Sequence, residues 1–271
     1  MATPHPSLPV FETLNIQQRS PGVVQIAMAR PTVFNAFDEQ MIADLDRAFE
    51  RLGSDDTVRV LVLAGEGKHF SAGADLQWMQ RAAAASVAWN LQDARQFAAM
   101  LQRIHSTPKP VVARVQGAAL GGGVGLTCAC DFAIATSQAS FAVSEAKFGI
   151  LPSVIGPYLV NAVGKRQALR LALSTTRIQA AEALALGLVQ QVVAADALDA
   201  TIDQTVRDLL VGGPQAQREI KQLYAQLAVG PVHAEVQELT AQTISRVRGT
   251  EEAREGFSAF LDKRPARWIP Q

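Results

Sequence analysis

Apolar residues recur along this chain in patterns that predict strands and helices in alternation. Near the start, two short stretches rich in apolar and β-branched residues cover residues 11–17 and 23–28. Ser20-Pro21-Gly22 lies between them, and Pro and Gly are the strongest local signals for a turn. The pattern therefore predicts a β-hairpin.

The middle of the chain alternates amphipathic helices with buried strands. Apolar residues spaced three and four apart predict helices over residues 38–52 and 87–105. Continuous apolar runs predict strands over residues 58–64, 111–116 and 132–135. Because strands that alternate with helices form βαβ units, the sequence predicts an α/β fold with a largely parallel sheet.

From Pro157 onward the apolar spacing is almost entirely helical. A strand is predicted only over residues 189–193, and no stretch is rich enough in Gly, Pro or Ser to indicate a flexible linker. We therefore predict a core over residues 1–195 and a helical region over residues 196–271. The helices predicted in this part cover residues 159–163, 167–173, 180–186, 198–210, 216–227, 232–247 and 251–261.

Composition and charge exclude several classes of protein. Of the 271 residues, 48% are hydrophobic, which is ample for a core. Lys plus Arg and Asp plus Glu number 25 each, so no overall field attracts nucleic acid or an anionic membrane surface. Cys128 and Cys130 are the only cysteines, which argues against a disulfide framework and against a zinc site.

The start of the chain gives no sign of targeting to a membrane or for export. Residues 1–10 contain three prolines and lack the basic and apolar regions of a signal peptide. No apolar run approaches the roughly 18 residues that a membrane-spanning helix needs. We therefore expect a soluble, unprocessed, cytoplasmic protein. The four histidines lack metal-ligand spacing, and we expect neither a metal nor a redox cofactor.

A cluster of glycines follows the predicted strand over residues 111–116. Gly121, Gly122 and Gly123 stand where a helix begins, and the first amides of a helix have no partner within it. Such a turn can present N–H groups to an oxygen that carries negative charge, although glycine-rich turns also serve close packing alone. Neither the G-x-G-x-x-G spacing nor the G-K-[ST] ending of a nucleotide loop is present. A second glycine-bearing turn covers residues 70–76.

Three motifs occur in order along the chain, namely Phe70-Ser71-Ala72-Gly73-Ala74-Asp75-Leu76, Gly117-Ala118-Ala119-Leu120-Gly121-Gly122-Gly123 and Ser144-Glu145-Ala146-Lys147-Phe148-Gly149-Ile150-Leu151-Pro152. Asn35-Ala36 precedes them, and residues 183–189 and 255–264 follow with further matches. Together they resemble the enoyl-CoA hydratase/isomerase, or crotonase, family, and within it the bacterial methylglutaconyl-CoA hydratases. The resemblance implies a crotonase-like ββα spiral with an acyl-CoA site and a C-terminal helical region that packs homotrimers, usually paired into hexamers.

The resemblance also implies a reaction centre. The backbone N–H groups of Ala74 and Gly122 match the family's two oxyanion-hole donors, which stabilise the charge that develops on a thioester oxygen. Losing one such donor typically costs about 2.7 to 4 kcal/mol of transition-state stabilisation. Glu145 matches one of the family's two catalytic glutamates. Gly125 stands where the other is expected, so a site with two acids cannot form unaltered.

Further residues match the family's positions for binding the substrate and its CoA moiety. Arg30 and Ala36 stand where the CoA phosphates and pantetheine are expected. Ala72 and Asp75 stand where backbone groups contact adenine. The remaining candidates in this part of the chain are Leu76, Trp78 and Gly121.

Some of these candidates also have purely structural interpretations. Trp78 is placed to line the acyl pocket, although an aromatic residue on a short helix is more often part of the core. Phe260 and Lys263 resemble a C-terminal pair that meets the CoA of a neighbouring subunit, although a solvated lysine at a helix end is nearly as common.

We expect the chain to hydrate the 2,3-double bond of a branched or glutaconyl-type enoyl-CoA, with Glu145 making both proton transfers. Apolar neighbours at residues 141, 143 and 148 predict a raised pKa for its carboxyl. A lone glutamate is also the pattern of family members that move a double bond without water, so an enoyl-CoA isomerase is the first alternative. The second is a non-catalytic acyl-CoA-binding or RNA-associated protein, against which the retained glutamate and the balanced charge argue. Coenzyme A is then part of the substrate and not a separate cofactor.

Overall fold

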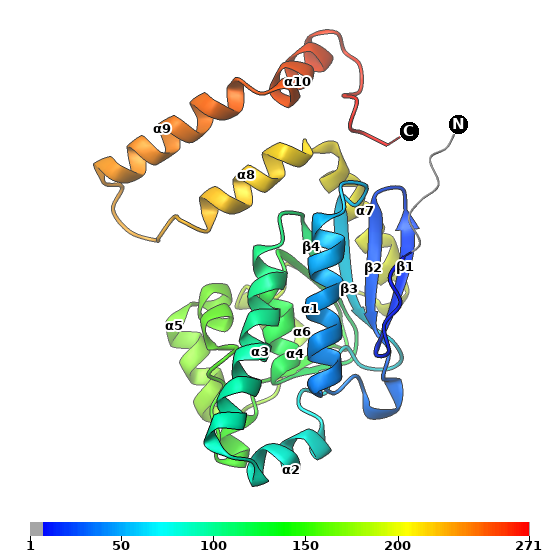
Figure 1. Ribbon diagram of the computed structural model, residues 1–271, viewed down its shortest axis with the longest axis vertical. Helices are drawn as coiled ribbons and strands as arrows, with labels where there is room; N and C mark the ends of the chain where they lie inside the picture. Colours follow the sequence, from blue (N-terminus) through cyan, green and yellow to red (C-terminus); the bar gives the residue numbers. More distant parts are fainter. Residues whose placement is uncertain (1–7, 271) are drawn as a thin grey trace.

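A computed structural model describes residues 8–270 of the chain (Figure 1). The prediction that the start of the chain lacks a signal peptide falls mostly on residues 1–7 and lies outside the described residues. Within residues 8–270, no helix is both long and apolar enough to cross a membrane.

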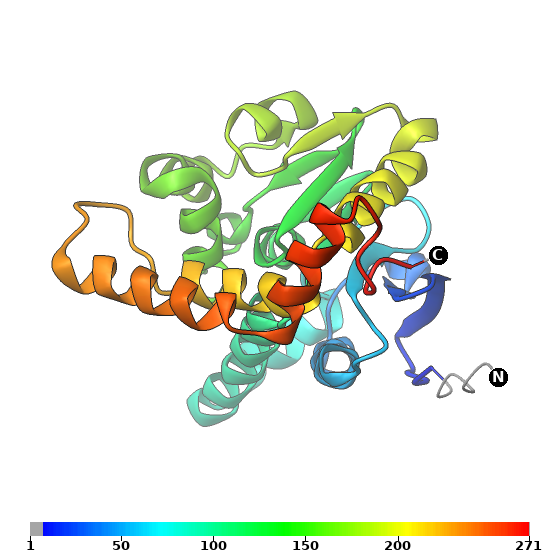
Figure 2. The same cartoon turned by 90° about the horizontal axis from the view of Figure 1, so that it is seen from above.

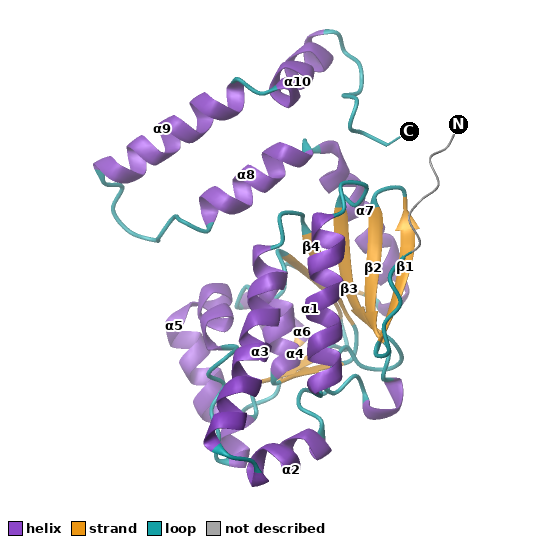
Figure 3. Ribbon diagram, viewed as in Figure 1, coloured by secondary structure: helices purple, strands orange, loops and turns teal. Residues whose placement is uncertain are grey.

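The main sheet has six strands in the order β1-β2-β3-β4-β6-β9 (Figure 3). Strands β1 and β2 pair antiparallel, and every other neighbouring pair is parallel, which confirms the predicted hairpin and the largely parallel sheet. The strands are β1 (Leu14–Ser20), β2 (Val23–Met28), β3 (Val60–Gly65), β4 (Val111–Val115), β6 (Phe132–Thr136) and β9 (Gln191–Val193).

The first strand begins and ends three residues later than the sequence predicts. Thr13 donates hydrogen bonds from both its backbone N–H and its hydroxyl to Oδ2 of Asp44, at 3.0 and 2.9 Å. Thr13 is therefore held by α1 as well as by the sheet, where its carbonyl accepts from the N–H of Ala29 at 2.8 Å just before the strand begins at Leu14. At the other end the strand runs to Ser20, because Gly22 adopts a φ of 76° and completes the turn.

A second sheet of three short strands was not predicted from the sequence. It consists of β5 (Ala118–Leu120), β7 (Ser140–Ala142) and β8 (Ile178–Gln179). Strands β5 and β7 are parallel and pair Leu120 with Ala142, so both end at the same edge of the sheet. The glycine turn follows β5, and Glu145 lies three residues beyond β7. This small sheet therefore brings the two motifs together.

Helices cover both faces of the main sheet. They are α1 (Glu39–Ser54), α2 (Leu76–Ala84), α3 (Val87–Ser106), α4 (Gly122–Ala129), α5 (Gly156–Ser174), α6 (Ala180–Ala185), α7 (Leu198–Val211), α8 (Pro214–Tyr224), α9 (Ala234–Arg248) and α10 (Glu251–Leu261). Short 3-10 turns cover Pro31–Val33, Glu145–Phe148 and Ala195–Ala197. The two helices predicted over 159–163 and 167–173 form the single element α5, which Gly164 interrupts with a φ of 75°.

Alternate side chains of each central strand pack into different layers. Leu61 and Leu63 of β3 pack on the side of α1, α3 and α4, where the larger core cluster lies. Val60 and Val62 of the same strand pack on the opposite side, against α7. This alternation follows from the two-residue period of a strand and explains why the central strands are apolar throughout.

The helices after residue 196 do not share one environment. Helix α7 belongs to the core, whereas α8, α9 and α10 extend from it as an arm (Figures 1 and 2). No residue of α8 or α9 is buried in this chain. Lys221 of α8 holds the arm to the core through Oδ2 of Asp131 at 2.6 Å, and the Trp268 indole donates to the carbonyl of Val211 at 3.0 Å.

Candidate active site

The segment 71–74 lies between two other pieces of backbone. Ser71 forms a parallel bridge with Ala119 of β5, and Ala74 forms one with Phe37. In the second bridge the carbonyl of Gly73 accepts from the Phe37 N–H at 2.7 Å, and the Asp75 N–H donates to the Phe37 carbonyl at 2.8 Å. Because both flanking groups face Phe37, the N–H of Ala74 points to the other side, where β5 lies.

A second backbone N–H follows from the end of β5. Gly121 adopts a φ of 50°, and its N–H donates to the carbonyl of Ala142 at 2.8 Å. This turn starts α4 at Gly122, whose N–H is one of the unpartnered amides of a helix start. Within residues 8–270 the amides of Ala74 and Gly122 have no hydrogen-bond acceptor.

Close backbone packing holds these two turns against each other. A Cβ built on Gly73 would lie 2.8 Å from the carbonyl oxygen of Leu120 and 3.8 Å from Cα of Gly121. Only glycine at residue 73 permits this approach, and its φ of 88° also favours glycine. The sequence analysis found both turns, and the structure places them side by side.

The carboxyl of Glu145 lies against the second turn. Its Oε1 is 3.1 Å from where a Cβ of Gly121 would be. The other oxygen, Oε2, is buried and has no hydrogen-bond partner among the described residues. Burial raises the pKa of the Glu145 carboxyl above its ordinary value, and backbone hydrogen bonds lower it less. The raised pKa that the sequence predicts is thus confirmed in direction, and an unpartnered acid oxygen lies beside a turn with a free amide.

The surroundings of Gly125 leave no room for a side chain. A Cβ on this residue would lie 2.9 Å from Cβ of Ile155 and closer still to its Cγ2. Ile155 comes directly before α5 and is only 2% exposed. The sequence analysis did not single out Ile155, because its contact with Gly125 joins residues thirty apart in the chain.

Aromatic side chains close one side of the second turn. A Cβ on Gly122 would lie 2.9 Å from Cδ2 of Phe37 and 3.1 Å from Cζ of Phe97. The ring of Trp78 meets Phe97 edge-on with the centroids 6.4 Å apart. Its indole N–H donates to Oδ1 of Asp93 at 3.1 Å. Trp78 therefore belongs to the apolar cluster beside the turn, and Phe37 and Phe97 are members that the sequence analysis missed.

Arg30 is committed to partners within the chain. Its guanidinium contacts the carbonyl of Ala36 at 2.7 Å, Oδ2 of Asp38 at 2.9 Å and Oδ2 of Asp75 at 3.2 Å. Asp38 and Asp75 cap the starts of α1 and α2. Arg30 thus links two helix starts, a role that sequence reasoning did not assign to it.

The remaining candidates differ in their surroundings. The N–H of Ala72 donates to the carbonyl of Phe34 at 2.9 Å, whereas Leu76 is 74% exposed. Phe260, which is 81% exposed, lies in the last turn of α10, and Lys263 follows this helix. Helix α10 lies at the opposite end of the molecule from α2 (Figure 1). The structure therefore does not bring this last pair to the rest of the candidate site within one chain.

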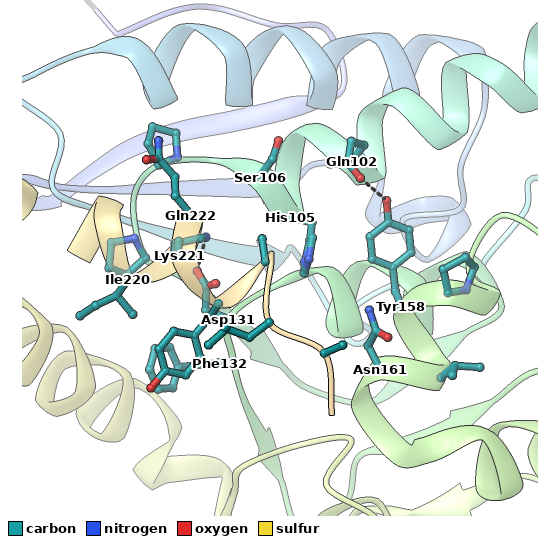
Figure 4. Close-up of a pocket in the computed structure, with 18 of the residues that line it drawn as sticks. Gln102, His105, Ser106, Asp131, Phe132, Tyr158, Asn161, Ile220, Lys221 and Gln222 are labelled. Carbon is teal, nitrogen blue, oxygen red and sulfur yellow. Dashed lines mark hydrogen bonds and ion pairs between the residues drawn. The ribbon is translucent and has the colours of Figure 1, made fainter. Parts of the chain in front are cut away.

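A large open cleft of about 1750 Å³ lies elsewhere, between the core and the arm (Figure 4). It is lined by α3, α5, α8 and the loop that follows α8, with Tyr158 and Gln102 on one side and Lys221 and Asp131 on the other. None of the sequence-predicted site residues lines it. In the part of the chain that the structure describes, no three His, Cys, Asp or Glu side chains are grouped as metal ligands.

Comparison with known proteins decides the family. The sequence pattern of the family described as "Enoyl-CoA hydratase/isomerase" matches residues 18–271. The chain belongs to the enoyl-CoA hydratase/isomerase family. A crystal structure of an enoyl-CoA hydratase from Shewanella pealeana has 38% sequence identity and a TM-score of 0.92, over 95% of this chain and 96% of that one. The fold is therefore the crotonase fold predicted from the sequence.

Relatives in this family carry out more than one reaction. A crotonyl-CoA hydratase of Syntrophomonas wolfei is 32% identical over 260 residues, which are 94% of this chain and 97% of that protein. A 1,2-epoxyphenylacetyl-CoA isomerase of Escherichia coli is 31% identical over 248 residues, 90% and 93% of the two chains. The chain is thus an enzyme of the enoyl-CoA hydratase/isomerase class, and both hydratase and isomerase chemistry fit it.

Proposed function

We propose that this enzyme adds water across the 2,3-double bond of an acyl-CoA thioester. The observation that carries the proposal is the unpartnered, buried Oε2 of Glu145, on a carboxyl that lies against a turn with a free amide. Burial raises the pKa of the Glu145 carboxyl, and a raised pKa suits a carboxyl to acid and base work. The hydratase names of the relatives support the direction of the reaction.

Two backbone amides would stabilise the reacting thioester. The N–H groups of Ala74 and Gly122 would donate to its carbonyl oxygen, which carries negative charge when C2 is enolate-like. Such preoriented donors favour the transition state over the ground state, because the charge develops where they already point. Backbone donors also persist through most side-chain substitutions.

Glu145 would then make both proton transfers. Its carboxylate accepts a proton from water as the water oxygen bonds to C3, and the double-bond electrons move toward the thioester oxygen. The same carboxyl then gives that proton to C2, so the atoms of one water are added and the carboxylate is restored. No metal or redox group takes part in this proposal, and coenzyme A enters only as part of the substrate.

The acyl group that we propose is branched or of the glutaconyl type. The support is the resemblance of the sequence to methylglutaconyl-CoA hydratases, of which the glycine at residue 125 is a part. We further propose that Arg30 acts on CoA through the backbone that it orders at Ala36 and Asp75, because its own charge is already paired.

The enzyme would act as a homotrimer or hexamer. Phe260 in the last turn of α10 and Lys263 directly after it belong to the arm, and α10 lies at the opposite end of the molecule from α2 (Figure 1). Their exposure and distance from the chain's own candidate site favour a role at the site of a neighbouring subunit. The unburied faces of α8 and α9 support an arm that packs against other copies.

A double-bond isomerase is the second candidate, and one observation favours it. The side chain of Ile155 fills the space beside Gly125, so Glu145 is the one acid at this turn among the described residues. A single carboxyl that takes a proton from one carbon and returns it to another needs no second acid. The isomerase of Escherichia coli among the relatives is consistent with this chemistry.

An assay with three substrates separates these functions. Crotonyl-CoA, methylglutaconyl-CoA and a 3-enoyl-CoA are offered to wild type, to Glu145→Gln and to the control Glu12→Gln, which changes an exposed glutamate. We expect hydration of one of the first two substrates, loss of turnover in Glu145→Gln and unchanged acyl-CoA binding. Conversion of the 3-enoyl-CoA alone would identify an isomerase. Turnover in Glu145→Gln above about a tenth of wild type would refute the acid/base role.

A further inference from the structure

Asn35 is a buried polar residue that the proposed reaction does not use. It is fully buried, and its φ of 54° lies in the left-handed region, where asparagine is found more often than most residues. Its Nδ2 donates to the carbonyls of Glu66 and His69, both at 2.9 Å. Its Oδ1 accepts from the N–H of Arg30 at 3.0 Å. The side chain therefore ties the loop after β2 to the loop after β3.

Two hydrogen bonds lead from Asn35 to the backbone beside Ala74. The hydroxyl of Ser71, a fully buried residue, donates to the carbonyl of Asn35 at 2.8 Å. The same hydroxyl oxygen accepts from the N–H of Gly73 at 3.2 Å. Gly73 directly precedes Ala74, so this link holds the peptide on one side of the glycine.

A second link runs along the main chain from Asn35 to Phe37. The N–H of Phe37 donates to the carbonyl of Gly73 at 2.7 Å. This carbonyl belongs to the same peptide as the N–H of Ala74. Ser71 thus holds one peptide that flanks Gly73 and Phe37 holds the other, which restricts the backbone freedom of the glycine on both sides.

Ser71 also joins this segment to the second turn. Its N–H donates to the carbonyl of Ala118 at 3.1 Å, and its carbonyl accepts from the N–H of Leu120 at 2.9 Å, both in β5. A Cβ built on Gly123 would lie 3.1 Å from Cβ of Ser71. The turn that carries the Gly122 N–H directly follows β5. Ser71 therefore contacts both of the turns whose N–H groups we propose as oxyanion donors.

We propose that Asn35 is a positioning residue for the oxyanion site. Its side chain holds the loop after β2 so that its own carbonyl reaches Ser71 and the main chain of Phe37 reaches Gly73. These contacts set the direction of the Ala74 N–H. This inference rests on the proposed function, because it assumes that this N–H binds the thioester oxygen.

Two variants break different parts of this network. Asn35→Gly removes three hydrogen bonds and keeps a residue that adopts a left-handed φ without strain. Misplacement by about 1 Å can cost about 100-fold in rate, and we expect Asn35→Gly to lower kcat at least about tenfold. Ser71→Ala removes the hydroxyl and keeps the Cβ beside Gly123. It leaves the link through Phe37 in place and should lower kcat by less.

The thioester carbonyl reports whether its donors are in place. Hydrogen bonds to a carbonyl oxygen lower its stretching frequency, which infrared spectra measure for bound butyryl-CoA with an isotopic label at the thioester carbon. Butyryl-CoA has no double bond and is not hydrated. We expect wild type to lower this frequency relative to free butyryl-CoA and Asn35→Gly to lower it less. The Kd of butyryl-CoA should change little, because oxyanion donors act mainly in the transition state.

Thr107→Val is a matched control for the loss of a buried hydrogen bond. Thr107 is 3% exposed, and its hydroxyl donates to the carbonyl of Arg103 at 2.7 Å, at the end of α3. We expect this variant to lower Tm and to leave kcat and the carbonyl frequency unchanged. A folded Asn35→Gly protein with the wild-type carbonyl frequency would overturn the proposal. If Asn35→Gly does not fold, the wild-type frequency in Ser71→Ala would overturn it instead.

Failure of this inference is distinct from failure of the proposed function. If wild type does not lower the frequency of bound butyryl-CoA, or if Glu145→Gln remains active, the proposed function itself fails. If wild type lowers the frequency, Glu145→Gln is inactive and Asn35→Gly matches wild type in the spectrum, the function stands and only the role of Asn35 is wrong.

Discussion

Replacement of Asp75 tests how the backbone N–H of Ala74 is held in place. Oδ1 of Asp75 accepts from the N–H groups of Gln77 and Trp78 at 2.8 and 3.3 Å, which caps α2. Its Oδ2 accepts from Arg30 at 3.2 Å. The residue directly follows Ala74, so these bonds help to hold the backbone next to the N–H that we propose as an oxyanion donor. Asp75→Ala removes the cap and the ion pair together.

The expected cost follows from the two losses. A helix cap is worth about 1 kcal/mol of stability. A hydrogen bond to a charged group is worth about 1.5 to 3 kcal/mol, but Arg30 keeps Asp38 as a partner, so we take about 1 kcal/mol. The sum of about 2 kcal/mol should lower Tm by about 4 to 8 °C in a chain of this size. Asp75→Asn keeps an oxygen that can cap and should lose about half as much.

Activity distinguishes the positioning role from stability alone. Misplacement of a reacting group by a fraction of an ångström to 1 Å costs up to about 100-fold in rate. We expect Asp75→Ala to lower kcat at least about tenfold and Asp75→Asn to recover most of it. The control Thr250→Ala removes the cap of α10, at the end of the arm, and should lower Tm without changing kcat. Wild-type kcat in Asp75→Ala would refute this reasoning.

Two further predictions concern pH. Burial raises the pKa of Glu145 above 4.5, so the stability linked to its proton is complete below that pH and is lost as pH rises through the higher folded-state value. Thermal unfolding from pH 5 to 8 should therefore show a smaller decline for Glu145→Gln than for wild type, and parallel curves would contradict this. The guanidinium of Arg264 holds the pKa of Glu255 at about 2, so the stability that this pair gives is present above 4.5 and is lost as pH falls toward 2. The protection of the α10 amides, which is their exchange rate compared with that of unfolded chain at the same pH, should fall only in that acidic range, and Arg264→Gln should move the onset to higher pH.

Local patterns predicted the elements that form the core and the two glycine turns. The central strands are apolar throughout and the helices are strongly periodic, so the bounds of each were predicted to within a few residues. The bounds of the first strand were wrong by three residues, and the bonds from Thr13 to Asp44 join residues thirty-one apart in the chain. The second sheet was missed because its strands span only two or three residues, too few for a period to appear.

Contacts between distant residues account for the rest of the candidate site. The sequence showed that Gly125 lacks an acid, but only the fold shows that Ile155 takes its space. Arg30 matched a CoA-binding position by resemblance, yet its guanidinium pairs with Asp38 and Asp75 at the starts of two helices. Spacing along the sequence does not predict these contacts, because each depends on how distant turns pack together in the fold.

Strands β5 and β7 run in the same direction and end level with each other. The relative positions of the Gly122 amide and of Glu145 along the two strands are therefore set by main-chain pairing and not by the side chains that follow. The side chains at residues 125, 145 and 155 can change while the backbone that holds them stays in place. Substitutions at these positions can therefore change the number of acids beside the glycine turn and leave the pairing of the two strands unaltered.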